Sequence, residues 1–518
     1  MSLRSSIGLA DATRSEVALF GVPALLSIGL AAAGIRYPAA VGDAFSRSFD
    51  LVLNYFGWWF ILLSFLLTVG LTAFSLSRYG HLRIGGPDAT PAFGRFSWLS
   101  MVFTVGYSIA VLFWGVAEPV YILQSPPEPS PVPGASPESL ALAFTYLHDI
   151  LPGLIAWYLP FAIAFGVIVW GTGDWRVSTV LTPILDRERY ASVYWLVDLL
   201  SLVAIVGGLA TSLGFIGRQL SSIVSVVYGV DSRLLTVGLF AGVAALFLAD
   251  VWLGLERGIR NAARVAVVAN VVASVVLFVL GPSLFIVELG LDAMGVWLNN
   301  LPRLMLYTDP VERSLWPQNW TSFWWAWWAA WGVFVGSFVA RVSRGRTVRE
   351  VFVGLCIVPT TLLVFQHAVL GGLALAPGNA AVIGDALAEG GNAAALSTAI
   401  TLVPYAPLVG ALLIVALVGY IVTSLDSAVY MLAAINTGDR APNARIRATW
   451  GVLMLSIGVM TTYLGGGTRV LESFSTTLAL PFTVLYAVVL YAAYVYVQQD
   501  VDWSEYAPRS QRDEQMQD

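Results

Sequence analysis

Long apolar runs separated by short polar segments make up most of this chain. A helix needs about 20 residues to cross a hydrocarbon core of about 30 Å, and apolar runs of this length recur from residue 17 to residue 498. The predicted spans are 17–35, 50–76, 97–124, 139–171, 192–229, 233–254, 261–288, 320–342, 349–374, 401–436, 446–465 and 473–498. Several exceed the minimum length, which indicates tilted or broken helices. The pattern predicts an all-α polytopic membrane protein with about 12 transmembrane helices.

Composition agrees with this pattern. Hydrophobic residues make up 58% of the 518 positions and charged residues only 11%, as expected for a chain whose solvent is membrane lipid. No separate soluble domain fits between the spans. The single cysteine, Cys356, lies in an apolar run, so no disulfide framework or cysteine metal site is available. The net charge of −5 gives no basis for nucleic-acid binding.

The positions of the basic residues predict the orientation in the membrane. All 27 basic residues are arginines. If the N-terminus is cytoplasmic, about twenty of them fall in inward loops or tails and six face outward. Positively charged loops stay on the cytoplasmic side, so we expect a multi-pass protein of the plasma (cytoplasmic) membrane with both termini in the cytoplasm.

Three outward segments lack the pattern of a membrane span. Residues 125–136 are proline-rich and residues 376–392 are rich in Gly and Ala, and neither is expected to form a regular spanning element. Residues 287–316 keep helical periodicity. They predict either an amphipathic helix along the outer interface or a helix within a surface loop.

Polar residues and weak helix formers at mid-span mark four candidate helix breaks. They are residues 104–108, 145–153, 207–212 and 423–427. Inside a membrane, the backbone at a break needs other partners, and transporters use such breaks to expose carbonyls to ions and substrates. The alternative is close helix packing through small and hydroxyl side chains, which we favour for residues 207–212.

The most unusual run is tryptophan-rich. Trp324, Trp325, Trp327, Trp328 and Trp331 fall within eight residues inside one span, although tryptophan usually prefers the membrane interface. Residues 324, 328 and 331 share one helical face. Such rings can hold a quaternary ammonium group, with about 0.5–2 kcal/mol per cation–π contact. An aromatic seam between helices is the alternative interpretation.

The same run carries a family resemblance. The stretches WTSFWWAWWAAWGVFVG (320–336) and ARVSRGRTVRE (340–350) resemble the characteristic helix of the betaine/choline/carnitine transporter (BCCT) family. HLRIGGPD (81–88), LFWGVAEP (112–119) and TSLDS (423–427) also match, in order along nearly the whole chain.

This resemblance implies a fold and a division of the chain. The fold is a LeuT-like five-plus-five inverted repeat formed by helices 3–7 and 8–12, with substrate held between helices 3, 4, 8 and 10. The implied segments are 1–96 for the cytoplasmic N-terminus and helices 1–2, 97–288 and 320–498 for the two repeats, 289–319 for an outer interfacial helix or loop, and 499–518 for a short cytoplasmic tail. Family members transport betaine-like or choline-like solutes by alternating access, and several form homotrimers.

Two sets of site residues carry over from the resemblance. Trp327, Trp328 and Trp331 match substrate-lining tryptophans of the family. The resemblance implies that Tyr107 contacts both the substrate and the coupling ion. The implied sodium site takes hydroxyls from Thr423 and Ser424 and carbonyls from Thr104 and Tyr107, with Tyr420 nearby. Sodium is a hard cation that suits such oxygens. Na⁺ is therefore the expected coupling ion, and no other cofactor is expected.

The fourth helix departs from the family pattern. An ungapped register from His148 places Asp149 and Leu154 at two tryptophan positions and Trp157 at a tyrosine position. We include Trp157 and Asp149 among the candidate substrate-binding residues. At a second sodium site, threonines are replaced by Ile205 and Leu209, so we expect that site to be absent.

Asp149 has three possible roles. It could face a substrate cation, pair with Arg218, or cap a solvated helix end; an ionisable group inside a span is usually functional. Protonation of Asp149 or His148 could also couple transport to protons. Glu118 is predicted to form structural hydrogen bonds, and His367 to lie in the core.

The sequence thus predicts a secondary active transporter of quaternary-ammonium or related compatible solutes, driven by sodium. The alternative is proton-coupled or exchange transport of another cationic or amine osmolyte. A membrane-embedded enzyme is disfavoured because no credible nucleophile or metal cluster is present. A non-transporting osmotic sensor is disfavoured because no added signalling domain is visible.

Overall fold

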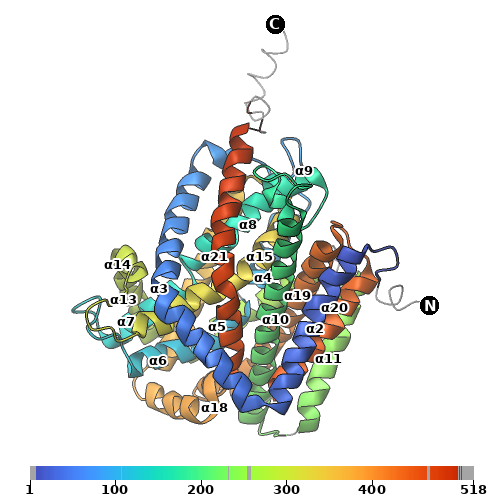
Figure 1. The fold of residues 1–518 in the computed structure, drawn as a ribbon. Coiled ribbons are helices and arrows are strands. Elements are labelled where there is room, and N and C mark those ends of the chain that lie inside the picture. The colour runs from blue at the N-terminus through green and yellow to red at the C-terminus, as the bar shows by residue number, and fades with distance from the viewer. Residues whose placement is uncertain are drawn as a thin grey trace.

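The computed structural model describes residues 8–106, 108–231, 233–253, 258–463, 467–499, 501 and 503. Within these residues the regular structure is helical, with a single isolated bridge between Arg83 and Thr347. Figure 1 shows the long helices running together as one bundle, with the start of α2 and the end of α21 toward the same end. The predicted all-α class is confirmed.

The chain enters the bundle through two long helices. Helix α2 (Arg14–Arg36) begins at Thr13, whose hydroxyl caps the backbone N–H of Glu16 while the Glu16 carboxylate bonds back to Thr13, a capping box. Helix α3 (Pro38–Leu76) begins with a proline, which suits the first turn because its missing N–H would have no partner there. Tyr37 is the single residue between the two helices.

Two predicted spans are interrupted. The span at 97–124 contains α4 (Arg95–Gly106) and α5 (Ser108–Trp114), with Tyr107 outside the described residues between them, and a turn at residues 115–116 separates α5 from α6 (Ala117–Gln124). The span at 139–171 becomes α7 (Pro137–Asp149), two π-helical segments, η2 (Leu154–Tyr158) and η3 (Phe165–Val169), and the short helices α8 (Leu159–Ala164) and α9 (Trp170–Thr172). The break predicted near residues 145–153 is thus confirmed. The one predicted at 104–108 contains Tyr107, which lies outside the described residues.

The other two candidate breaks lie inside continuous helices. Residues 207–212 belong to α10 (Ala191–Tyr228), and residues 423–427 to α19 (Ala406–Thr437). In α19 the hydroxyl of Thr423 donates to the carbonyl oxygens of Gly419 and Tyr420 in the preceding turn of the same helix. Hydroxyl residues can remain in a membrane helix in this way, so the break predicted at 423–427 is wrong.

The remaining helices complete the bundle. They are α11 (Arg233–Leu253), α12 (Gly258–Leu280), η5 (Gln318–Ser322), α15 (Phe323–Val342), α16 (Val348–Phe352), η6 (Val353–Ile357), α17 (Val358–Leu375), α20 (Ala444–Tyr463) and α21 (Gly467–Gln499). Two short 3₁₀ turns are η1 (Arg78–His81) and η4 (Val177–Leu181). Nine helical stretches of the described residues are long and apolar enough to cross a membrane, and Ala241–Leu253 of α11 is a shorter apolar helix.

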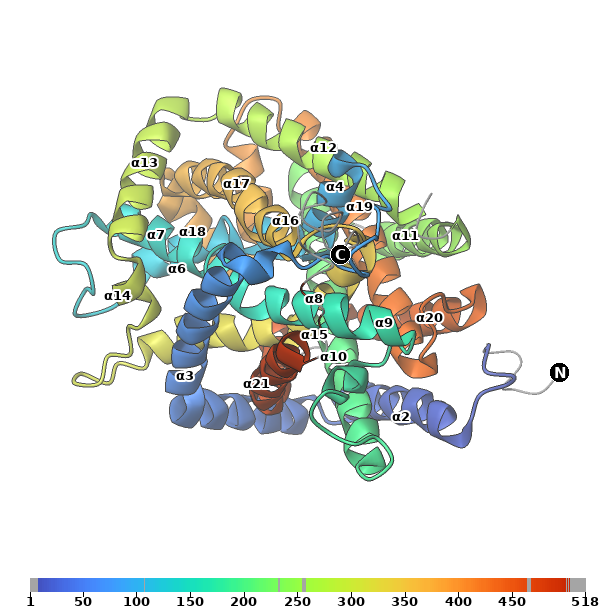
Figure 2. The same ribbon diagram turned by 90° about the horizontal axis from the view of Figure 1, so that it is seen from above.

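The outer segments are more helical than the sequence suggested. Helix α18 (Asn379–Thr401) contains most of the Gly/Ala-rich stretch, with one non-helical residue, Gly391, at φ 68°. Residues 376–392 are predicted to form no regular spanning element, and α18 is a helix that is not among the described stretches long and apolar enough to cross a membrane. Its glycine takes up the kink. Helices α13 (Ser283–Asn299) and α14 (Leu301–Met305) confirm helical structure within 287–316, and Figure 2 shows them at the edge of the bundle.

Helix α15 lies at the centre. It packs against α3, α4, α8, α10 and α21, and Figure 2 shows it surrounded by other helices. Its side chains are almost all buried, whereas large apolar side chains such as Trp58, Trp252 and Val279 are exposed on the outside of the bundle. The tryptophan run is therefore an internal feature of the protein and does not form an interfacial belt.

Candidate functional site

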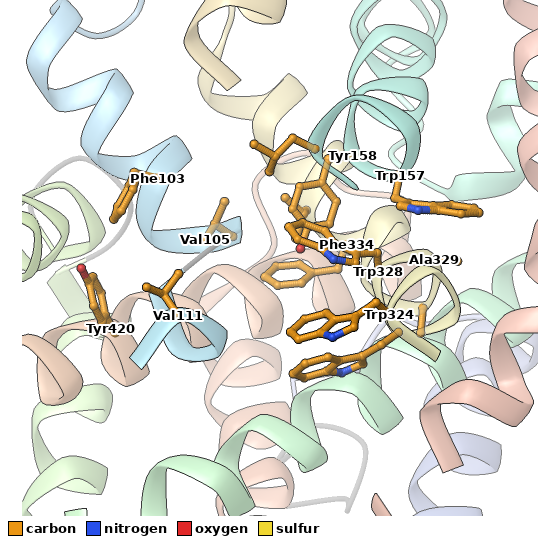
Figure 3. Packing of buried hydrophobic residues seen from close by; sticks show 14 of the residues in the cluster. Phe103, Val105, Val111, Trp157, Tyr158, Trp324, Trp328, Ala329, Phe334 and Tyr420 are labelled. Atoms are coloured by element: carbon orange, nitrogen blue, oxygen red, sulfur yellow. The ribbon is translucent and has the colours of Figure 1, made fainter. Parts of the chain in front are cut away.

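Trp328 occupies the gap between α7 and η2. Its indole N–H donates to the carbonyl oxygen of His148 over 2.8 Å, and its ring lies 4.9 Å from the ring of Tyr158, tilted by 53°. Gly153 lets the indole reach this position, because a Cβ there would lie 2.8 Å from Cε2 of Trp328. Figure 3 shows Tyr158 and Trp328 facing each other. Two aromatic faces thus meet where a membrane helix is interrupted.

Trp327 belongs to a separate aromatic cluster on the same helix. Its ring stacks on Phe323 at 6.0 Å and lies 5.2 Å from Trp324. Trp114 of α5 and Phe215 of α10 complete the cluster, with ring centroids 6.3 and 5.7 Å from Trp327. These contacts match the predicted aromatic seam between helices, so the run combines a seam at Trp327 with an aromatic pair at Trp328.

Trp331 lies one turn further along α15. Its indole nitrogen would be 3.2 Å from a Cβ placed at Gly208, and its ring is 5.8 Å from Phe334. The close approach to Gly208 agrees with a packing role for the small residues of α10. The structure therefore separates the three predicted substrate-lining tryptophans into different surroundings.

Tyr158, not Trp157, lies beside Trp328. Trp157 is fully buried, and its ring makes an edge contact with Tyr486 of α21 at 5.2 Å. The hydroxyl of Tyr486 also donates to the carbonyl of Trp157. In Figure 3 Trp157 points away from the Tyr158 ring. Both residues belong to the π-helical turn η2, whose geometry directs Tyr158 toward Trp328 and Trp157 toward α21.

The hydroxyl of Tyr158 connects η2 with α4. It donates to the carbonyl oxygen of Gly106 over 3.0 Å. Tyr107, predicted to contact both substrate and sodium, lies outside the described residues.

Two of the residues predicted for a sodium site contact each other. The Ser424 hydroxyl donates to the carbonyl of Thr104 over 3.1 Å, which brings α19 against the last turn of α4. Thr423 is adjacent, and both hydroxyl side chains are buried. Hydroxyl and carbonyl oxygens are suitable ligands for sodium. Tyr420 is buried one turn earlier on α19, and Figure 3 shows it near Phe103, away from Trp328.

Glu118 and His148 form a buried acid–imidazole pair next to the aromatic pair. Oε1 of Glu118 is 2.6 Å from Nδ1 of His148, and Nε2 of His148 is 3.0 Å from the hydroxyl oxygen of Thr321. Glu118 stands in the first turn of α6 and is completely buried. The predicted hydrogen-bonding role of Glu118 is confirmed. By holding the His148 side chain, Glu118 also fixes the end of α7, where the His148 carbonyl accepts from Trp328.

Asp149 makes a second pair of the same kind. Its Oδ2 lies 2.7 Å from Nε2 of His367 on α17, and Nδ1 of His367 donates to the carbonyl of Leu363 over 2.8 Å. Asp149 is only 2% exposed, so the prediction that it caps a solvated helix end is wrong. Pairing with Arg218 is also wrong, because the hydrogen-bonded partner of Asp149 is His367 and its Oδ1 has none. His367 is buried as predicted, but the sequence gave no sign of this partnership.

Interrupted helices whose carbonyls, hydroxyls and aromatic rings meet inside a membrane bundle are typical of membrane transporters. A sequence model of the betaine/carnitine/choline family of transporters matches residues 18–502. The chain belongs to this family.

Characterised relatives span nearly the full length of this protein. It is 31% identical over 478 residues to the ectoine/hydroxyectoine transporter of Virgibacillus pantothenticus, covering 90% of this chain and 93% of the relative. It is 28% identical to the glycine betaine transporter OpuD of Bacillus subtilis, covering 89% and 90%. The betaine/ectoine transporter LcoP of Corynebacterium glutamicum is 29% identical, with 93% and 78% covered.

Proposed function

We propose that this protein is a secondary active transporter that takes up a betaine-like or ectoine-like compatible solute across the plasma membrane. The observation that carries the proposal is the aromatic pair Trp328–Tyr158, held at the α7–η2 break by Gly153 and by the His148 carbonyl. A quaternary ammonium group has no N–H to donate, so aromatic faces are a suitable partner for it. The relatives named for betaine and for ectoine support transport of a compatible solute.

Sodium is the proposed driving ion. The Ser424 hydroxyl meets the Thr104 carbonyl of α4, and the buried Thr423 hydroxyl is its neighbour along α19. The carbonyl of Gly106, two residues further along α4, accepts from Tyr158. An ion bound beside Thr104 would therefore favour one arrangement of the α4 backbone that also holds Tyr158. Such a shared element is the physical requirement for coupling between two ligands.

Uptake into proteoliposomes tests this proposal. Labelled glycine betaine, ectoine, choline and carnitine are supplied outside, with an inward sodium gradient or with sodium equal on both sides. We expect glycine betaine or ectoine to accumulate, and the gradient to increase the accumulation. A folded protein that neither accumulates nor exchanges any of the four solutes would disprove the proposed function. Accumulation that ignores the sodium gradient would disprove sodium coupling alone.

Orientation is a second part of the proposal. Both termini are placed in the cytoplasm, in agreement with the arginine distribution and with the position of α2 and α21 at one end of the bundle. The only native cysteine, Cys356, is buried, so a cysteine introduced at Ser15 or Gln498 can be probed in whole cells. Labelling of either position by a membrane-impermeant thiol reagent before lysis would contradict the orientation.

A further inference from the structure

The hydrogen bonds of His367 determine how many protons its pair with Asp149 holds. Nδ1 lies 2.8 Å from the Leu363 carbonyl oxygen, which can only accept. Nδ1 therefore carries a proton. Nε2 lies 2.7 Å from Oδ2 of Asp149. An unprotonated Nε2 facing a carboxylate would place two acceptors against each other. One further proton must sit between them, on the imidazole or on the carboxyl group.

The neighbouring pair has no such requirement. His148 contacts Glu118 through Nδ1 and the hydroxyl of Thr321 through Nε2. A neutral imidazole satisfies both contacts, because Nδ1–H donates to the carboxylate and the threonine hydroxyl donates to Nε2. The two pairs use consecutive residues of α7, and only the hydrogen bonds of the Asp149–His367 pair require an additional proton.

The electrostatic surroundings favour keeping that proton. The titratable groups that interact with Asp149, besides His367, are Glu118 and Tyr158. Both lie within the membrane bundle and neither supplies a positive charge. On the helices packed against α17, Glu288 and Asp292 of α13 and Asp385 and Glu389 of α18 are exposed. Arg260 and Arg264 stand in the first two turns of α12, half-buried, and Arg264 donates to the hydroxyl of Ser97 on α4. Losing the proton would leave a buried negative charge next to Glu118, and uncompensated buried charges are strongly unfavourable.

The pair also stabilises the substrate site. Asp149 is the last residue of α7, and His148, directly before it, presents the carbonyl that accepts from Trp328. The contact with His367 attaches this end of α7 to α17. The protonated pair therefore holds the helix end that positions Trp328, and deprotonation would release it.

We infer that Asp149 and His367 form the binding site for a coupling proton, which enters with the solute when the protonated pair holds the aromatic site in place. This inference rests on the proposed function and adds a second ion to it. Proton and solute bind together in the outward-facing state. When the inward-facing state gives water access to Asp149, the pair loses its proton to the cytoplasm as carboxylate and neutral imidazole. Solute affinity is then highest at low pH, where the pair is protonated. Above the pH at which the pair loses its proton, the affinity falls about tenfold per pH unit, because solute binding is linked to the binding of one proton.

Asp149→Asn is the decisive variant because its amide can donate to Nε2 of a neutral His367, which imitates the protonated pair without a titratable group. Proteoliposomes containing a trapped pH indicator receive external glycine betaine or ectoine at equal sodium. For the wild type we expect internal acidification together with solute uptake. For Asp149→Asn we expect solute binding with a flat pH dependence and no acidification. His81→Gln, which alters an exposed histidine of η1, should behave as the wild type.

Two results would overturn the inference. One is wild-type solute uptake without proton movement, which leaves the proposed function intact. The other is acidification by Asp149→Asn equal to that of the wild type. If no solute binds to the wild type, the proposed function fails instead, and proton coupling fails with it.

The proton site can also be examined without solute. The chain contains three histidines, His81, His148 and His367, so ¹⁵N-histidine labelling gives a spectrum simple enough to assign by variants. We expect the His367 ring signals to shift with pH in the wild type and to stay constant in Asp149→Asn. Equal behaviour of the two proteins would refute the proton site itself. His367→Gln, which should also abolish proton movement, provides a second variant if Asp149→Asn does not fold.

Discussion

Trp328 donates its indole N–H to the carbonyl oxygen of His148, and this single bond connects the centre of α15 with the end of α7. The bond fixes the plane of the indole, and Tyr158 faces that indole. The orientation of the aromatic pair thus depends on a backbone carbonyl that is available only because α7 ends at Asp149.

Two substitutions of Trp328 distinguish the contribution of its aromatic ring to solute binding from that of its hydrogen bond. Trp328→Leu removes both, and loss of a desolvated cation–π contact of about 0.5–2 kcal/mol should weaken solute binding by about 2- to 30-fold. Trp328→Phe keeps an aromatic face and should have a smaller effect. Binding is measured by isothermal titration in detergent. Trp297→Phe, on α13 at the edge of the bundle, is the matched control, and an equal loss in that variant would argue against a specific site at Trp328.

Tyr158→Leu and Trp157→Leu compare two adjacent aromatic residues. Because Tyr158 faces Trp328 and Trp157 packs against Tyr486, only Tyr158→Leu should reduce solute affinity. Trp157→Leu should lower thermal stability instead, by a few kcal/mol, as expected for a large-to-small core substitution. Affinity and melting temperature are measured on the same samples. The reverse pattern would support the ungapped register and contradict the π-helical shift.

Gly153→Ala tests the close approach between the helix break and the indole. The new Cβ would lie 2.8 to 3.1 Å from three atoms of Trp328, so the indole must move or the backbone must shift. Such overpacking costs about 1–3 kcal/mol, and we expect lower stability together with weaker solute binding. Gly70→Ala in α3, where no atom lies within 4 Å, should be neutral or stabilising. Unchanged binding in Gly153→Ala would show that the position of Trp328 is not critical.

Ser424→Ala removes the hydroxyl that meets the Thr104 carbonyl. A hydrogen-bonding or ligating oxygen that acts on a charged group contributes about 1.5–3 kcal/mol. The sodium concentration for half-maximal uptake should therefore rise by about 10- to 100-fold, while solute affinity at saturating sodium changes little. Ser337→Ala is the control, since the Ser337 hydroxyl bonds back to Phe334 within α15. A sodium dependence equal to that of the wild type would remove Ser424 from the ion site.

Arg447→Met tests a buried charge pair between α20 and α19. Nη1 of Arg447 lies 3.9 Å from Oδ1 of the fully buried Asp426, and Nη2 donates to the Val251 carbonyl. Removing one partner of a buried ion pair costs about 3–5 kcal/mol, seen as a lower melting temperature. Adding Asp426→Asn should recover part of the loss. Arg445→Met, at an exposed position, should change stability by less than about 0.5 kcal/mol.

The helical membrane class and most of the spans could be predicted from the sequence, because about 20 apolar residues in a row have few alternatives to a membrane helix. The break near residues 145–153 was also visible, since Pro152 and Gly153 interrupt the helical pattern. The helix at Asn379–Thr401 was not, because a Gly/Ala-rich stretch has weak local preferences and its packing against α6, α10 and α17 decides its structure.

The sequence by itself determined which chemical groups are present: the tryptophan run, the adjacent hydroxyls Thr423 and Ser424, and ionisable residues inside the spans. The tertiary structure decided which of them meet. It placed Tyr158 instead of Trp157 beside Trp328, because a π-helical turn changes the register within a few residues. It also brought His367 to Asp149 across 218 positions of sequence, a contact that no local pattern encodes, because helix packing alone determines which faces come together.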